Sequence, residues 1–214
     1  MRSWILIAAT LVVLVPAGTT SAGKYNPERN IGDAAPVWKD LPGTDGKTHS
    51  LADLKDKEAI VVVVTCNTCP YAVEYEDRII EFAKKHAGEK SKIAVVALSV
   101  NTREEADLLP AMKERAQEKK FPFAYLFDES QKIGRDFGAT RTPEFFVLDK
   151  QRKIIYMGAM DDSTDPKKVT KSYVELAVQA ALAGKKPETE ETVAIGCGVR
   201  YKRKSRARRR KKTK

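Results

Sequence analysis

Two cysteines separated by two residues, Cys66 and Cys69, are the side chains of this sequence whose type and spacing point most directly to chemistry. Such a pair can cycle between dithiol and disulfide, because residues at i and i+3 approach each other in one helical turn. Zinc needs four ligands, and one pair with the distant His49 and His86 does not supply them. A purely structural disulfide over so short a loop adds little entropic stabilisation. The spacing therefore favours a redox pair, and we expect no metal and no cofactor.

The sequence on either side of the pair indicates where it lies in a fold. Residues 59–65 are apolar and mostly β-branched without alternation, which predicts a strand buried on both faces. Residues 71–86 have a helical pattern that ends near Gly88. The cysteines are thus predicted between the end of a buried strand and a helix N-terminus. Unpaired N–H groups and the helix dipole stabilise a thiolate there.

The remaining elements predict an α/β fold in which helices cover both faces of a mixed central sheet. An N-terminal hairpin is expected over 40–51, with its turn at 44–46, and Ser50 is expected to cap a short helical turn. Strands 144–149 and 153–158 must run antiparallel, because their connection is tight. Further strands are expected at 92–100 and 123–128, and helices at 104–119 with a bend at Pro110, at 129–138 ending at Gly138, and at 165–184.

A second motif, Thr142-Pro143, stands directly before a predicted strand. A proline at this position cannot donate to a sheet, and a cis peptide bond is one reason for its presence. A cis-proline loop over the cysteines would leave a backbone edge that holds an extended substrate. An ordinary turn proline is the other interpretation, and the sequence leaves both open.

The motifs in this order resemble the thioredoxin-like superfamily. "CNTCP" after a buried strand, "RTP" before a hairpin and a final helix, and "IGDAAPVW" near the start are similar to its redoxin branch. That branch includes peroxiredoxins of the alkyl hydroperoxide reductase and thiol-specific antioxidant type, and periplasmic thiol-disulfide oxidoreductases. The resemblance covers about residues 30–202, and it implies a thioredoxin-like three-layer α/β/α fold with an N-terminal β-hairpin.

The resemblance also implies residue roles. Cys66 would be the exposed attacking thiolate and Cys69 the resolving thiol, while Thr142 and Pro143 would bind substrate. A peroxiredoxin-like assignment competes, because Cys69 is followed by proline as the peroxide-reacting cysteine is. Cys66 then stands where that family has threonine, and Arg141 is a candidate for its arginine only through its proximity to Thr142. The two residues between the cysteines tune the redox potential, so the direction of electron flow stays open.

Two accessory residues are candidates. Cys197 lies far from the pair between two glycines, and it is a distant resolving thiol, an intermolecular partner or a spectator. Glu74 follows the pair closely, and its carboxylate could take the proton of Cys66.

The two ends of the chain differ from its middle. Residues 1–22 combine a basic start, a short apolar run and small residues, which predicts a signal peptide cleaved after Ala22, with a retained anchor as the alternative. Residues 201–214 hold ten of the 39 Lys and Arg residues, and the remaining 29 equal the 29 acidic residues. We expect a redoxin domain at 23–187 and an extension at 188–214, with Cys197 and a disordered basic tail.

These features predict an exported protein of the periplasm or cell envelope, where disulfides persist. We expect a thiol-disulfide oxidoreductase that acts on a protein disulfide and exchanges electrons with a redox partner protein. The alternatives are a peroxiredoxin-like antioxidant peroxidase that takes a hydroperoxide, and a binding module without catalysis that its tail anchors. For the tail we expect an anionic membrane or an acidic envelope polymer, and nucleic acid is disfavoured for an exported chain. A tail without a specific partner is the remaining possibility.

Overall fold

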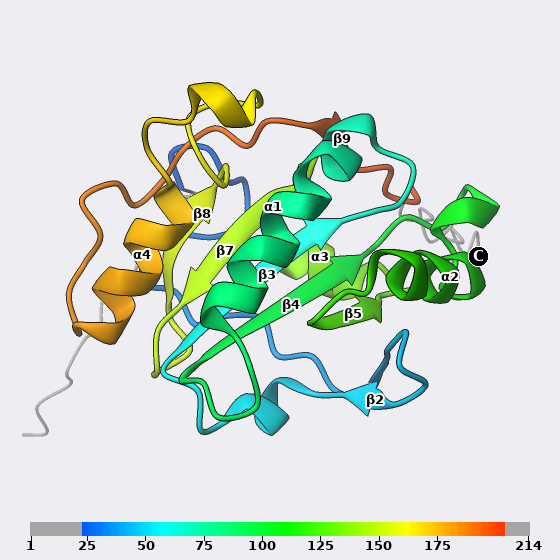
Figure 1. The fold of residues 1–214 in the computed structure, drawn as a ribbon, viewed down its shortest axis with the longest axis horizontal. Coiled ribbons are helices and arrows are strands. Elements are labelled where there is room, and N and C mark those ends of the chain that lie inside the picture. The colour runs from blue at the N-terminus through cyan, green and yellow to red at the C-terminus, as the bar shows by residue number, and fades with distance from the viewer. Residues whose placement is uncertain (1–22, 204–214) are drawn as a thin grey trace, which may run out of the picture.

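The computed structural model describes residues 23–203, so the predicted signal peptide and residues 204–214 of the tail lie outside the described residues. Five strands form a central sheet in the order β5-β4-β3-β7-β8 (Figure 1). β3 pairs with β4 and β4 with β5 in parallel, whereas β7 is antiparallel to both β3 and β8. The predicted mixed sheet is therefore confirmed. Its strands are β3 (Ala59–Thr65), β4 (Ile93–Ser99), β5 (Ala124–Phe127), β7 (Glu144–Leu148) and β8 (Ile154–Gly158).

The central position of β3 in the sheet accounts for its almost wholly apolar sequence. Ile60, Val62 and Val64 belong to the apolar core on one face of the sheet, and Val61 and Val63 belong to the core on the other. A strand covered on both faces has no solvent side, so its apolar residues do not alternate with polar ones.

Helices cover the sheet in two layers. α1 (Pro70–His86), α2 (Leu109–Lys119) and α4 (Tyr173–Leu182) pack on one face (Figure 1). The short α3 (Lys132–Asp136) packs on the other face with the N-terminal segment and a 3-10 helix at Leu51–Leu54. This arrangement confirms the three-layer α/β/α fold.

The N-terminal hairpin is also confirmed. β1 (Leu41–Pro42) pairs antiparallel with β2 (Thr48–His49), and Gly46 in the connecting turn has a φ of 80°. Such a conformation suits glycine because it has no Cβ. Ser50 precedes the 3-10 helix as predicted, and its N–H donates to the Asp53 carboxylate at 2.7 Å.

Three helix predictions are wrong in part, and the simplest case is the helix expected at 129–138, of which only α3, Lys132–Asp136, forms. The segment expected as one helix from 104 begins with a separate 3-10 turn, Glu105–Asp107, and α2 starts after it, with Pro110 in its first turn rather than at a bend. A proline is tolerated there because the first-turn N–H groups have no partner within the helix. The last helix is likewise divided into a 3-10 turn at Pro166–Lys168 and α4.

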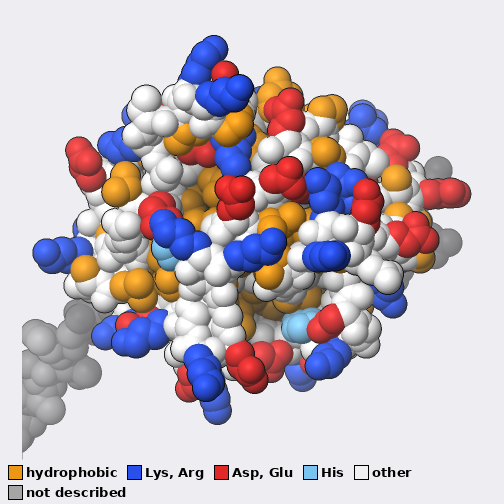
Figure 2. All heavy atoms as spheres, viewed as in Figure 1, with side chains coloured by type: hydrophobic (Ala, Val, Ile, Leu, Met, Phe, Trp, Pro, Cys, Tyr) orange, Lys and Arg blue, Asp and Glu red, His pale blue; other side chains and the backbone are white. Residues whose placement is uncertain are grey.

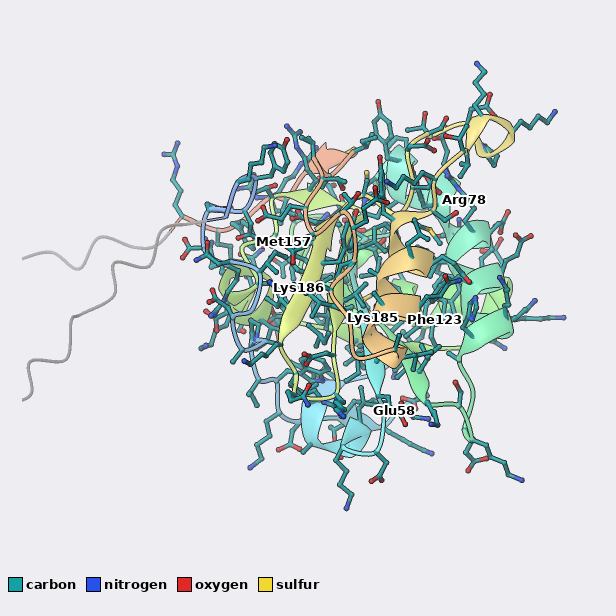
Figure 3. The ribbon with its side chains drawn as sticks, turned by 90° about the vertical axis from the view of Figure 1, so that its left-hand side faces the viewer. Glu58, Arg78, Phe123, Met157, Lys185 and Lys186 are labelled. Carbon is teal, nitrogen blue, oxygen red and sulfur yellow. The ribbon has the colours of Figure 1, made fainter. Side chains whose placement is uncertain are left out.

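After α4 the chain runs back across the domain. Met157 of β8 exchanges backbone hydrogen bonds with this stretch: its N–H donates to Glu190 O, and its carbonyl accepts from Thr192 N–H, both at 3.1 Å (Figure 3). The chain then forms β9 (Cys197–Gly198), which pairs antiparallel with β6 (Arg141–Thr142). The described part of the predicted extension therefore packs against the domain and brings Cys197 to the Thr142 loop.

The surface of the domain has mixed charge. On the face shown in Figure 2, basic and acidic side chains are interspersed rather than segregated, in keeping with the equal numbers of the two before residue 201. Among residues 23–203, no helix has both the length and the apolar character needed to cross a membrane.

Candidate active site

The structure brings both cysteines of the pair to Thr142. Cys66 directly follows β3, and Cys69 is the N-cap residue of α1. The Cys66 sulfur lies 3.7 Å from the Thr142 hydroxyl, and the Cys69 sulfur lies 3.0 Å from the Thr142 carbonyl oxygen. The Thr142–Pro143 peptide bond is cis, which decides between the two interpretations of this proline. All three cysteines are free thiols here.

The expectation of an exposed Cys66 is wrong. Cys66 is 2% exposed and Cys69 is 4% exposed. Cys197 packs against the cluster that the two cysteines form with Ala72 of α1. The C-terminal extension adds to this burial through Cys197, a contact that the local sequence could not reveal.

The two thiols of the pair have opposite pKa shifts. Burial and the nearby Asp107 carboxylate raise the pKa of Cys66. Burial also raises the pKa of Cys69. Hydrogen bonds from the side chains of Cys197 and Thr142 and from backbone N–H groups lower this pKa by more than burial raises it, so the net shift is downward. The contact with the Thr142 carbonyl favours the protonated thiol, but these donors outnumber that single acceptor. Cys69 is therefore the more readily ionised thiol of the pair.

Asp107 fixes the loop between the cysteines, and sequence reasoning missed it. Its fully buried carboxylate accepts hydrogen bonds from the backbone N–H groups of Asn67 at 2.8 Å and Thr68 at 3.0 Å. It also accepts from the Thr68 hydroxyl at 2.7 Å and the Asn101 amide at 3.2 Å. The one signal for this role was its place after β4, because parallel neighbouring strands end at the same edge of a sheet.

Glu144 holds the loop that carries Thr142. Its buried carboxylate accepts from the backbone N–H groups of Thr140 at 2.8 Å and Arg141 at 3.0 Å. The Arg141 side chain is exposed and donates to the Gly196 carbonyl at 3.4 Å. Its guanidinium therefore contacts the extension and makes no hydrogen bond to either sulfur.

Glu74 is exposed on α1, and no hydrogen bond in the described part of the chain joins it to a cysteine. The carboxylate that acts electrostatically on Cys66 is that of Asp107. Within residues 23–203, no group of three or more His, Cys, Asp or Glu side chains is placed to hold a metal ion.

The family model named Redoxin matches residues 30–174, and the chain therefore belongs to the redoxin family. A hypothetical protein from Sinorhizobium meliloti 1021 is similar, with 31% identity and a TM-score of 0.76 over 84% of this chain and 98% of its own. An uncharacterised conserved protein from Geobacillus kaustophilus has 28% identity and a TM-score of 0.75, over 82% of this chain and 94% of its own. Curated proteins gave no match.

A thiol:disulfide interchange protein of the thioredoxin family from Chlorobium tepidum TLS shares the fold. It has 22% identity and a TM-score of 0.52, over 64% of this chain and 91% of its own. The fold is therefore thioredoxin-like, and membership of the redoxin family supports a thiol-based redox function at the level of the family.

Proposed function

We propose that this chain is an exported thiol-disulfide oxidoreductase with Cys66 and Cys69 as its dithiol/disulfide centre. The observation that carries the proposal is the convergence of both sulfurs on Thr142, at 3.7 Å and 3.0 Å, from a strand end and a helix N-cap. The helix N-terminus stabilises a thiolate and the buried strand fixes its position.

The pKa directions assign the first attack to Cys69, the reverse of the roles that the family resemblance implies. The Cys69 thiolate attacks one sulfur of a substrate disulfide, and the other substrate sulfur leaves as a thiolate. Cys66 then loses its proton and attacks the Cys69 sulfur, which releases the second substrate thiolate. The products are a reduced substrate and a Cys66–Cys69 disulfide, which a partner protein reduces again.

Turnover of a protein disulfide tests this assignment. With insulin as substrate and dithiothreitol as reductant, Cys69→Ser is expected to lower the rate at least about a hundredfold, because the nucleophile is lost. The double variant Cys66→Ser, Cys197→Ser is expected to accumulate a mixed disulfide between Cys69 and substrate, visible by mass, because neither of the other two cysteines remains to resolve it. Unchanged turnover in Cys69→Ser, with unfolding curves that match the parent protein, would overturn the proposal.

A peroxidase is the second candidate, since Cys69 has a lowered pKa and is followed by Pro70. In that reaction the thiolate takes an oxygen from the hydroperoxide, an alcohol leaves, and the sulfenic acid condenses with a thiol to give a disulfide and water. The exposed Arg141, hydrogen-bonded to Gly196, disfavours it. Consumption of hydrogen peroxide faster than exchange with a protein disulfide would favour the peroxidase.

A further inference from the structure

Residues 196–202, here named the C-terminal segment, lie along the backbone edge beside Pro143. Thr142 is paired with Cys197 and Arg141 with Gly198 in antiparallel register, and the Val199 N–H donates to the Thr140 carbonyl at 3.0 Å. This is the edge that would hold an extended substrate by strand addition. The chain itself occupies it, and Figure 1 shows β9 near the α1 end that carries Cys69.

Gly196 permits this close approach. A Cβ atom at this residue would stand 2.1 Å from the Thr142 carbonyl oxygen, closer than any side chain tolerates. Gly198, two residues along the same segment, has open space at the equivalent position. The fit of the segment therefore depends on one of the two glycines that flank Cys197.

The far end of the segment is anchored on α3. The Tyr201 hydroxyl donates to the Ala139 carbonyl at 2.9 Å, and its ring lies under the Arg135 guanidinium at 4.3 Å. Buried Gln131 accepts from the Lys202 N–H at 2.7 Å and donates to the Arg200 carbonyl at 3.2 Å. These contacts keep β9 seated against β6.

We propose that the C-terminal segment is a built-in substrate strand, and that its Cys197 is a third redox residue that exchanges with the Cys66–Cys69 disulfide to form a Cys69–Cys197 disulfide. Three observations carry this inference: the register that pairs Cys197 with Thr142, the packing of Cys197 against the cluster that holds both active-site cysteines, and the close fit of Gly196. The inference rests on the proposed function, because the first disulfide forms there.

The exchange involves no net oxidation. Cys197 loses its proton to solvent, and its thiolate attacks the Cys69 sulfur of the Cys66–Cys69 disulfide. The Cys66–Cys69 bond breaks, Cys66 leaves as a thiolate and takes up a proton, and the Cys69–Cys197 bond forms. In the reduced protein, burial raises the pKa of Cys197, and its hydrogen bond with Cys69 and the negative charge of Cys69 raise it further. The contribution of that charge disappears once Cys69 is in a disulfide, so oxidation of the pair favours the attacking thiolate.

Peptide mapping distinguishes the two disulfides. Cys66 and Cys69 lie in one tryptic peptide, 58–78, and Cys197 lies in another, 186–200. The full chain would be oxidised with one equivalent of glutathione disulfide, blocked with an alkylating reagent, digested and analysed by mass spectrometry. We expect a cross-linked pair of these peptides in equilibrium with the internally bridged 58–78, and a nearly complete cross-link in Cys66→Ser.

The two glycines provide a matched test of the geometry. Gly196→Ala is expected to lift the segment and to lower the yield of the cross-link roughly tenfold, because overpacking forces the backbone apart. Gly198→Ala adds the same methyl group in open space and is expected to leave the yield unchanged.

The outcomes separate this inference from the proposed function. An internally bridged 58–78 peptide without any cross-link to 186–200 would overturn the inference and leave the proposed function standing. Equal cross-link yields in the two glycine variants would also overturn it, since Cys197 would then reach Cys69 without the seated strand. If no disulfide of either kind forms, the proposed function itself fails.

Discussion

At the scale of single residues, the site gives opposite pKa shifts to two thiols that are three positions apart in the chain. Cys69 is the N-cap residue of α1, and hydrogen bonding with the Cys197 thiol favours its ionised form. Cys66 lies deeper and beside the Asp107 carboxylate. Cys69 therefore ionises more readily and serves as the attacking thiol, whereas Cys66 stays protonated until the resolving step.

Alkylation against pH tests this difference. The rate at Cys69 is expected to rise with a midpoint below the ordinary thiol pKa of 9.0, and the rate at Cys66 with a midpoint above it. Fragmentation of the 58–78 peptide assigns each modification. The reverse order of the two midpoints would contradict the assignment of Cys69 as the attacking thiol.

Asp107 links the stability of the loop to the chemistry of Cys66. Asp107→Asn removes a negative charge near the sulfur, so the pKa of Cys66 is expected to fall. The loss of acceptor capacity is expected to cost about 1–3 kcal/mol in urea unfolding. Asp128→Asn is the matched control: this buried carboxylate accepts two backbone N–H groups at the start of α3, and its loss should cost similar stability without changing the thiol. An unchanged Cys66 pKa in Asp107→Asn would refute the electrostatic role.

At the scale of elements, α1 is tied to its neighbours by charged pairs. Glu76 is buried and accepts from the Arg115 guanidinium of α2 at 3.0 Å and 2.6 Å. Arg78 of α1 (Figure 3) donates to Asp161, in the connection between β8 and α4, at 2.7 Å. These pairs fix the helix whose N-terminus carries Cys69.

Arg115→Ala is expected to lower the free energy of unfolding by roughly 1–3 kcal/mol, because Glu76 stays buried without its main partner. The other carboxylate partner of Arg115 is Glu118, whose side chain is 68% exposed. Glu118→Ala should therefore change stability by less than about 0.5 kcal/mol. Urea denaturation of both variants measures the difference. Equal effects would show that the Glu76 pair contributes no more than a surface contact.

The elements that were predictable from sequence are those with a long local pattern. The apolar run of β3 and the helical pattern of α1 specified both elements to within one residue. The break before α4 was not visible, because it depends on a side-chain contact with the preceding loop: the Thr170 N–H donates to the Asp162 carboxylate, eight residues earlier, at 2.9 Å. Pro110 was misplaced because a proline fits either a bend or a first turn.

At the scale of the molecule, the site is assembled from segments far apart in the chain. Sequence reasoning found Cys66, Cys69, Thr142 and Pro143, because each stands at a recognisable strand or helix boundary. It could not connect Asp107 to the loop at 67–68 or pair Cys197 with Thr142, because two-residue strands and single buried carboxylates leave no periodic signal.

The basic tail carries the net positive charge of the chain, because basic and acidic residues are equal in number before residue 201. We propose that the tail binds an anionic membrane or an acidic envelope polymer. Deletion of residues 204–214 removes eight Lys and Arg residues, each of which contributes about 1 kcal/mol near an anionic surface. Sedimentation with phosphatidylglycerol vesicles at low salt should show binding by the full chain and none by the deletion, with thiol exchange unchanged. Equal binding by both would contradict the anchoring role.

The reduction potential of the Cys66–Cys69 pair tests the central claim most directly. Equilibration with glutathione buffers, followed by trapping of free thiols, is expected to show a reversible two-electron transition between about −270 mV and −120 mV. A value near the lower limit would indicate a reductant and one near the upper limit an oxidant. A pair that exchanges with no redox buffer under native conditions would contradict the account, and the cysteines would then be a structural feature of the fold.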